Sequence, residues 1–191
     1  QSTIAMSTND PFYLQRFVDA QAPIYDSVVA ELRIGAKRSH WMWFIFPQIQ
    51  GLGASDMARR YAITSIDEAI AYLAHPLLGS RLRQCTDLIL AVENRSLTQI
   101  FGFPDDRKFR SSMTLFTHAA PEERRFSQAL EKYCQGQPDP RTLDVLRSTT
   151  TQSSGPSRHP HEAPRHWWRM PAGCKRRSPG LPLRPPTRSA E

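Results

Sequence analysis

The chain has 191 residues, enough for one folded domain that needs neither a metal nor a disulfide to build its core. Its formal charge of +7 is concentrated near the end: residues 148–191 hold eight basic and two acidic residues, whereas residues 1–147 hold 17 and 16. This balance argues against a strongly basic nucleic-acid-binding domain, and the longest apolar run, residues 41–46, is far shorter than the about 20 residues that cross a bilayer.

The first sixty residues predict three short helices around one apolar segment. Asp10 and Pro11 have the character of a helix cap and a first helical residue. A second helix follows, with apolar residues at i, i+3, i+4 and i+7 counted from Tyr25. The apolar run 41–46 is too short for periodicity to separate a strand from a helical turn, and we expect an extended or irregular core segment there. A short helix is expected over residues 55–61.

From residue 65 onward, cap signals separate the predicted helices. Residues 65–68 and 96–99 are capping boxes, in which a serine is followed three residues later by Glu or Gln. Prolines mark other helix starts, at Pro104, Pro121 and Pro140, and the pair His75 and Pro76 ends the helix that opens at residue 65. Because no repeat and no strand–helix alternation appears, the pattern predicts a single all-α domain of seven or eight short helices over residues 10–147.

The two ends of the chain are expected to lie outside this domain. Residues 1–9 are polar, lack the features of a signal peptide, and predict a flexible N-terminus in a cytoplasmic protein. Residues 148–191 hold eight of the 16 prolines, with many Arg and Ser and few aliphatic residues. Such a segment buries too little apolar surface to fold, so we expect a disordered basic tail that binds nucleic acid at most non-specifically.

No metal or cofactor is expected. The three cysteines, Cys85, Cys134 and Cys174, have no metal-binding or disulfide spacing, and the first two fall on apolar helical faces. The chain also lacks phosphate-binding and dinucleotide-binding glycine patterns and the common hydrolase motifs. Nothing in the sequence predicts an oligomeric state.

The first candidate site lies in residues 37–48, which combine cations, a hydroxyl, an imidazole, indoles and an amide. Its candidate ligand-binding residues are Lys37, Arg38, Ser39, Trp41, Trp43 and Gln48. His40 is the candidate catalytic residue, as a general acid or base. The indoles would form a flat wall and the cations would hold an anion. The alternative is a core segment flanked by solvated charges.

The second candidate site lies in residues 105–114. Helical spacing places Lys108, Ser111 and Ser112 on one flank, where hydroxyls and a cation together can hold phosphate or carboxylate. The alternative is a close helix contact made by small residues.

Residues 37–48, with the letters KRSHWMWFIFPQ, resemble the DUF1810 family, which has the Rv1873-like fold. The resemblance continues through residues 51–53, 75–79 and 111–116, and covers about residues 10–146. It implies a mostly helical single domain and supplies no established activity. Family members are sometimes labelled calpastatin-like, but nothing before Arg147 resembles a disordered, repeat-bearing protease inhibitor, so that label is taken as a misnomer.

Three functional hypotheses follow from the sequence. The leading one is a small cytosolic protein, with or without enzymatic activity, that binds an anionic metabolite such as a nucleotide or an ADP-ribose-like group. Its pocket would lie between residues 37–48 and residues 108–114. The second is a non-catalytic protein-interaction module, which would expose an apolar patch instead of a polar cavity. The third is nucleic-acid binding through the tail alone.

Overall fold

Ten helices joined by short loops make up residues 10–153, the part of the chain that this computed structural model describes. They are α1 (Gln15–Gln21), α2 (Tyr25–Arg33), α3 (Met42–Ile45), α4 (Asp56–Arg60), α5 (Ile66–Ala74), α6 (Pro76–Ala91), α7 (Leu97–Phe101), α8 (Asp105–Ala119), α9 (Arg124–Cys134) and α10 (Pro140–Ser153). The all-α class predicted from the sequence is confirmed. Within residues 10–153, strand-like pairing is limited to one parallel bridge between Ile49 and Ile63.

The helix count exceeds the predicted seven or eight because the shortest helices are below the length at which periodicity is informative. The apolar run expected to be extended or irregular forms α3, a single turn in which the N–H of Phe46 donates to the carbonyl of Met42 over 3.0 Å. Helix α1 starts later than Pro11. The carboxylate of Asp10 instead accepts hydrogen bonds from the N–H groups of Leu14 (2.8 Å) and Gln15 (2.9 Å), the residues at the start of α1.

The last helix runs past the predicted end of the domain. Helix α10 starts at Pro140, directly after the capping Asp139, as the sequence indicates, and continues to Ser153. The boundary predicted at Arg147 therefore falls inside a helix. The predicted flexible N-terminus (residues 1–9) and the rest of the predicted tail (residues 154–191) lie outside the described residues.

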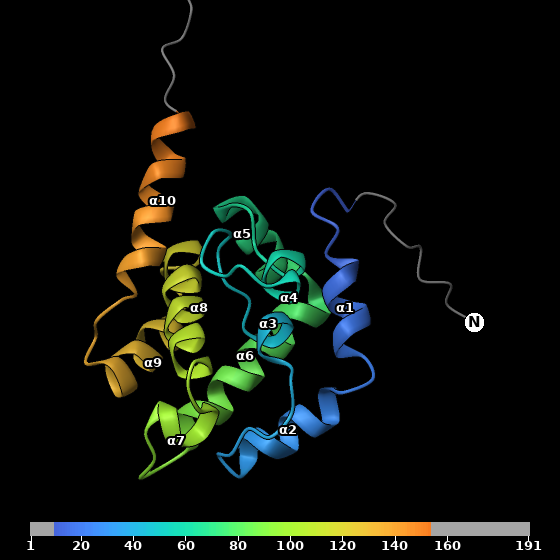
Figure 1. Ribbon diagram of the computed structural model, residues 1–191, viewed down its shortest axis with the longest axis vertical. Helices are drawn as coiled ribbons and strands as arrows, with labels where there is room; N and C mark the ends of the chain where they lie inside the picture. Colours follow the sequence, from blue (N-terminus) through green and yellow to red (C-terminus); the bar gives the residue numbers. More distant parts are fainter. Residues whose placement is uncertain (1–9, 154–191) are drawn as a thin grey trace, which may run out of the picture. The chain divides into compact units, whose positions relative to one another are not determined.

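Helix α8 is central to the core. Phe109, Met113 and Phe116 recur at helical spacing along it, and all three side chains are fully buried. Figure 1 shows α8 with α9 and α10 to one side and α5 and α6 to the other, and α8 packs against α9, α10 and α5. Its remaining faces meet α7 and α3, so the side of α8 that carries Lys108 and Ser111 is held close to the segment that follows α3.

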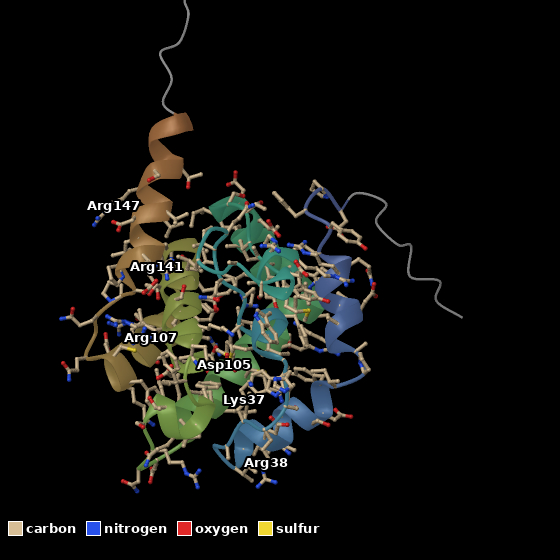
Figure 2. The ribbon with its side chains drawn as sticks, in the orientation of Figure 1. Lys37, Arg38, Asp105, Arg107, Arg141 and Arg147 are labelled. Atoms are coloured by element: carbon tan, nitrogen blue, oxygen red, sulfur yellow. The ribbon has the colours of Figure 1, made fainter. Side chains whose placement is uncertain are left out.

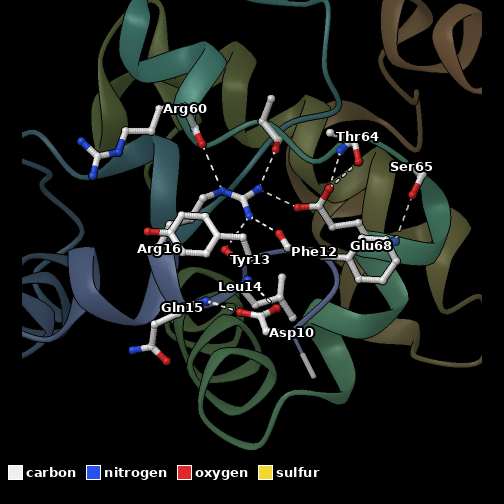
Figure 3. Close-up of polar contacts among 11 residues, drawn as sticks. Asp10, Phe12, Tyr13, Leu14, Gln15, Arg16, Arg60, Thr64, Ser65 and Glu68 are labelled. Atoms are coloured by element: carbon white, nitrogen blue, oxygen red, sulfur yellow. Dashed lines mark hydrogen bonds and ion pairs between the residues drawn. The ribbon is translucent and has the colours of Figure 1, made fainter. Parts of the chain in front are cut away.

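A buried ion pair fixes α1 against the start of α5 (Figure 3). The guanidinium of Arg16 contacts the carboxylate of Glu68 over 2.6 Å, and their side chains are 9% and 2% exposed. The other Glu68 oxygen accepts from the N–H (2.8 Å) and hydroxyl (2.6 Å) of Thr64. Ser65 caps α5 as predicted, by accepting from the N–H of Glu68. The Glu68 side chain, however, does not close the expected capping box, because it is used by Arg16 and Thr64.

The loop between Ile49 and Ile63 forms one wall of the site described below. Its base is closed by the bridge, in which Gln50 donates to Ile63 over 2.8 Å and Ile63 donates to Gln48 over 2.9 Å. The short helix α4 lies inside this loop and has no buried residue. The loop is therefore held by its closed base and by the buried Tyr61 and Ala62 at its end.

Candidate functional site

The carboxylate of Glu31, on α2, organises the first candidate segment. It accepts hydrogen bonds from the N–H of Arg38 (2.8 Å), the N–H and hydroxyl of Ser39 (3.2 and 2.5 Å) and the indole N–H of Trp41 (2.8 Å). Burial acts to raise the pKa of Glu31, but these hydrogen bonds outweigh it and hold the pKa below its usual range. Ser39 and Trp41 thus use their polar groups to hold the fold.

The two candidate segments meet at Asp105, the first residue of α8. Its carboxylate contacts the ammonium groups of Lys37 (2.8 Å) and Lys108 (2.7 Å). Each ammonium group also lies over an indole ring, Lys37 over Trp41 at 5.3 Å and Lys108 over Trp43 at 4.5 Å. Burial acts to raise the pKa of Asp105, but the two lysines outweigh it, so the net pKa is lowered and the group is ionised at neutral pH.

A cleft of about 640 Å³ opens beside this junction. Its walls are the loop after α3 with the start of α4, the first half of α8 with the two residues before it, and the start of α10. The lining residues are Trp43, Gln48, Leu52, Gly53, Ala54, Ser55, Ala58, Phe103, Pro104, Arg107, Lys108, Arg110, Ser111, Asp139, Pro140 and Arg141. We call it the α8–α10 cleft.

The lining of the α8–α10 cleft is strongly cationic, with four cations, Arg107, Lys108, Arg110 and Arg141, and Asp139 as its single carboxylate. Figure 2 shows Arg107 and Arg141 on the α8 and α10 side of the molecule, with Asp105 and Lys37 near the foot of α8.

These four cations differ in how far their donor groups are already bonded within the protein, and so in how far they could bind a ligand. The guanidinium of Arg110 donates to the carbonyls of Gln137 (2.9 Å) and Pro138 (3.0 Å), so it holds the α9–α10 connection. Arg107 is exposed and lies over the ring of Phe103 at 4.9 Å. The Asp139 carboxylate accepts from the N–H (2.9 Å) and hydroxyl (2.6 Å) of Thr142 and caps α10. The cleft therefore presents more unpaired positive than negative charge.

The predicted site residues divide into two sets. Those that line the α8–α10 cleft are Trp43, Gln48, Lys108 and Ser111. Those that do not are Lys37, Arg38, Ser39, His40, Trp41 and Ser112.

The predicted site residues outside the cleft are either buried in the fold or exposed elsewhere on the surface. Lys37 is the buried partner of Asp105, with a side chain only 7% exposed. Arg38 and His40 are exposed at the surface, and Trp41 is a core residue at 1% exposure. Ser112 is fully buried, and its hydroxyl has no hydrogen-bond partner among the residues that the structure describes. It faces the core because it lies three residues after Phe109 and four before Phe116, within the apolar stripe of α8.

Sequence reasoning did not select Arg107, Arg110, Arg141 or Phe103. A signal was present for two of them, since Arg107 and Arg110 stand in the segment that supplied Lys108 and Ser111, and Arg107 precedes Ser111 by one helical turn. Arg141 follows a recognisable helix cap, but nothing local shows that α10 returns beside α8.

No group of three or more His, Cys, Asp or Glu side chains that could hold a metal occurs within the described part of the chain. Burial raises the pKa of the Cys85 thiol to about 12, which suits a core residue and not a nucleophile. None of the described helices is both long enough and apolar enough to cross a membrane.

The fold and the cleft define a small all-helical protein with a cationic cleft, and comparison with known proteins gives its family. The family model described as a protein of unknown function (DUF1810) matches residues 11–146, so the chain belongs to the DUF1810 family. The crystal structure of the conserved hypothetical protein Rv1873 from Mycobacterium tuberculosis is 56% identical, with a TM-score of 0.72. The similarity covers 72% of this chain and 99% of that one. No curated protein matches the chain. The family and fold expected from the resemblance are confirmed.

Proposed function

We propose that this protein binds a small anionic metabolite in the α8–α10 cleft, in the size class of a nucleotide or an ADP-ribose-like group. The observation that carries the proposal is the charge of the lining, four cations against one carboxylate that already caps α10. Such clustering costs electrostatic repulsion in the free protein, and an anionic ligand relieves it.

The size and chemistry of the cleft support an organic ligand over a bare ion. Its volume of about 640 Å³ lies within the range of small-molecule sites, roughly 300–1,000 Å³. The amide of Gln48 and the half-buried ring of Trp43 stand at one side, and Leu52, Ala58 and Pro104 add apolar surface. An uncharged planar body would pack there, with its anionic groups toward the arginines.

We propose binding without assigning a reaction. His40, the predicted general acid or base, is exposed and does not line the cleft. The rival hypothesis of a protein-interaction module gains no support from the surface. Over residues 10–153, the exposed large apolar side chains lie on five separate segments, at Tyr13, Ile34, Ile70, Leu77 and Phe103. Of these, Phe103 already lies beneath Arg107 in the cleft.

The test is calorimetric titration of the full chain with AMP, ADP and ADP-ribose, together with thermal-shift measurement. We expect at least one of these to bind and to raise the melting temperature. Arg107→Gln removes an exposed cation and should raise the dissociation constant about tenfold, the effect of losing one charge-assisted hydrogen bond. Arg38→Gln, an exposed cation outside the cleft, is the matched control and should change it less than twofold. No binding by any probe, or equal losses in the two variants, would overturn the proposal.

A further inference from the structure

The cations of the α8–α10 cleft stand on both flanks of α8. Arg107 and Ser111 are four residues apart and share one stripe of the helix. At about 100° per residue, Lys108 lies to one side of that stripe and Arg110 to the other. Lys108 packs on Trp43, and Arg110 binds the carbonyls that lead into α10. The cleft therefore has one cationic side near Trp43 and another near the start of α10.

Arg141 belongs to the α10 side, and a buried hydrogen bond fixes its place. The hydroxyl of Thr142, its neighbour, lies 2.7 Å from the hydroxyl of Ser111. Ser111 follows Arg107 by about one helical turn, and both Arg107 and Arg141 line the cleft, so the gap between these two arginines lies within it. Two arginine side chains can close that gap around one ligand.

The Arg141 guanidinium has most of its donors available. It is exposed, and its one hydrogen bond within residues 10–153 runs to the carbonyl of Leu52 over 3.4 Å, which is long for such a bond. Leu52 is on the loop that forms another wall of the cleft. An anion between these walls would offer Arg141 shorter and charge-assisted bonds.

The net charge of the lining predicts how much negative charge the ligand carries. Asp105 lies outside the lining and pairs with both Lys37 and Lys108, so Lys37 and the four lining cations together face Asp105 and Asp139, and an excess of three positive charges remains. A phosphomonoester carries about −1.5 to −2 at neutral pH, and a second linked phosphate adds about one more charge. Two linked phosphates match the cleft, and one does not.

We propose that Arg141 forms a second anion subsite and that the ligand is a diphosphate ester, with one phosphate at Arg107 and Lys108 and the other at Arg141. This inference rests on the proposed function of the same cleft. It specifies the ligand as the class that includes nucleoside diphosphates and sugar diphosphates.

The experiment compares AMP and ADP on the full chain and on three variants of α10. Wild-type protein should bind ADP about tenfold more tightly than AMP. Arg141→Gln should remove most of that advantage while it leaves the affinity for AMP within twofold. Arg147→Gln changes an exposed arginine of the same helix that does not line the cleft, and it should leave both affinities unchanged. Arg141→Lys, which keeps a cation, should keep part of the preference for ADP.

The outcomes separate the two proposals. Equal affinity of the wild type for AMP and ADP, or an Arg141→Gln variant that weakens both equally, overturns the second subsite and leaves the anion cleft standing. Failure of the wild type to bind AMP, ADP and ADP-ribose overturns both. Melting temperatures of the three variants, measured without ligand, show whether α10 is intact.

Discussion

At the scale of single residues, the most demanding arrangement is the buried ion pair of Arg16 and Glu68. The Arg16 guanidinium donates to the backbone carbonyls of Phe12 (2.5 Å), Tyr13 (2.8 Å), Arg60 (3.0 Å) and Ala62 (3.0 Å) as well as to the carboxylate (2.6 Å). All five donors are used, and both Glu68 oxygens are also bonded. A shallow cavity of about 490 Å³ adjoins the pair, and the polar groups of the pair itself serve the fold.

Glu68→Ala should therefore be strongly destabilising. It removes the negative partner of a buried guanidinium, and losses of this kind cost roughly 3–5 kcal/mol in free energy of unfolding. The neighbouring Asp67 is exposed and lies in the same first turn of α5, so Asp67→Ala loses a similar interaction with the helix dipole and should cost less than about 1 kcal/mol. Urea denaturation of the two variants gives the comparison. Similar losses in both would mean that the ion pair contributes little.

The residue scale also shows why the candidate site could be predicted only in part. Lys108 and Ser111 line the cleft because both lie on the flank of α8 beside its apolar stripe, and that stripe is visible in the sequence. Ser39 and Trp41 are withdrawn from the site by Glu31, which belongs to another helix. No pattern within residues 37–48 indicates that a carboxylate on another helix accepts hydrogen bonds from them.

At the scale of elements, α5 and α6 are joined by a close backbone contact at Gly79. A Cβ built on Gly79 would lie 2.0 Å from the carbonyl oxygen of Leu73, near the end of α5. The same carbonyl accepts a hydrogen bond from Arg83 over 3.2 Å. Arg83 in turn pairs with Glu123, whose pKa is lowered by these hydrogen bonds. The bare backbone of Gly79 lets one arginine connect α5, α6 and the segment before α9.

Gly79→Ala should reverse the usual effect of this substitution. In an unobstructed helix, Ala is favoured over Gly by about 1 kcal/mol. Here the methyl group would overlap a backbone atom that cannot turn aside, so we expect a loss of about 1–3 kcal/mol or more in the free energy of unfolding. The adjacent Ser80 is exposed on the same helix, and Ser80→Ala is the control, expected to be neutral or slightly stabilising. Thermal or urea unfolding decides, and an unchanged or raised stability of Gly79→Ala would contradict the close contact.

Elements with a cap and several turns could be predicted from the sequence, whereas those defined by tertiary contacts could not. The second capping box, Ser96 with Gln99, is formed in full, and the α10 cap at Asp139 stands where expected. Helix α3 was missed because four residues carry no measurable period. The cleft itself needs α10 beside α8, a pairing held by the buried contact of Ser111 with Thr142, which no local signal specifies.

At the scale of the whole molecule, most of the net positive charge lies in a part of the sequence outside the helical domain. Residues 1–153 carry 17 basic and 16 acidic residues, while residues 154–191 carry eight and two. The family match ends at residue 146, and 72% of this chain accounts for 99% of the Rv1873 chain. A shorter chain therefore forms this fold in a close relative, so the fold does not require the basic segment.

Removing residues 154–191 should abolish DNA binding and leave the stability of the helical domain nearly unchanged. The full chain, with eight basic residues in that segment, should bind duplex DNA weakly. The logarithm of its binding constant should fall linearly with the logarithm of the salt concentration. The shortened chain, close to neutral, should lose this binding and keep its melting temperature within a few degrees, because every buried contact described above lies within residues 10–153. Filter binding at several salt concentrations and calorimetric melting measure both. Arg107→Gln in the full chain is the control, since it changes the cleft and should leave DNA binding unaltered. Persistent DNA binding by the shortened chain would instead locate the interaction on the helical domain, and the α8–α10 cleft would then have to be tested as its site.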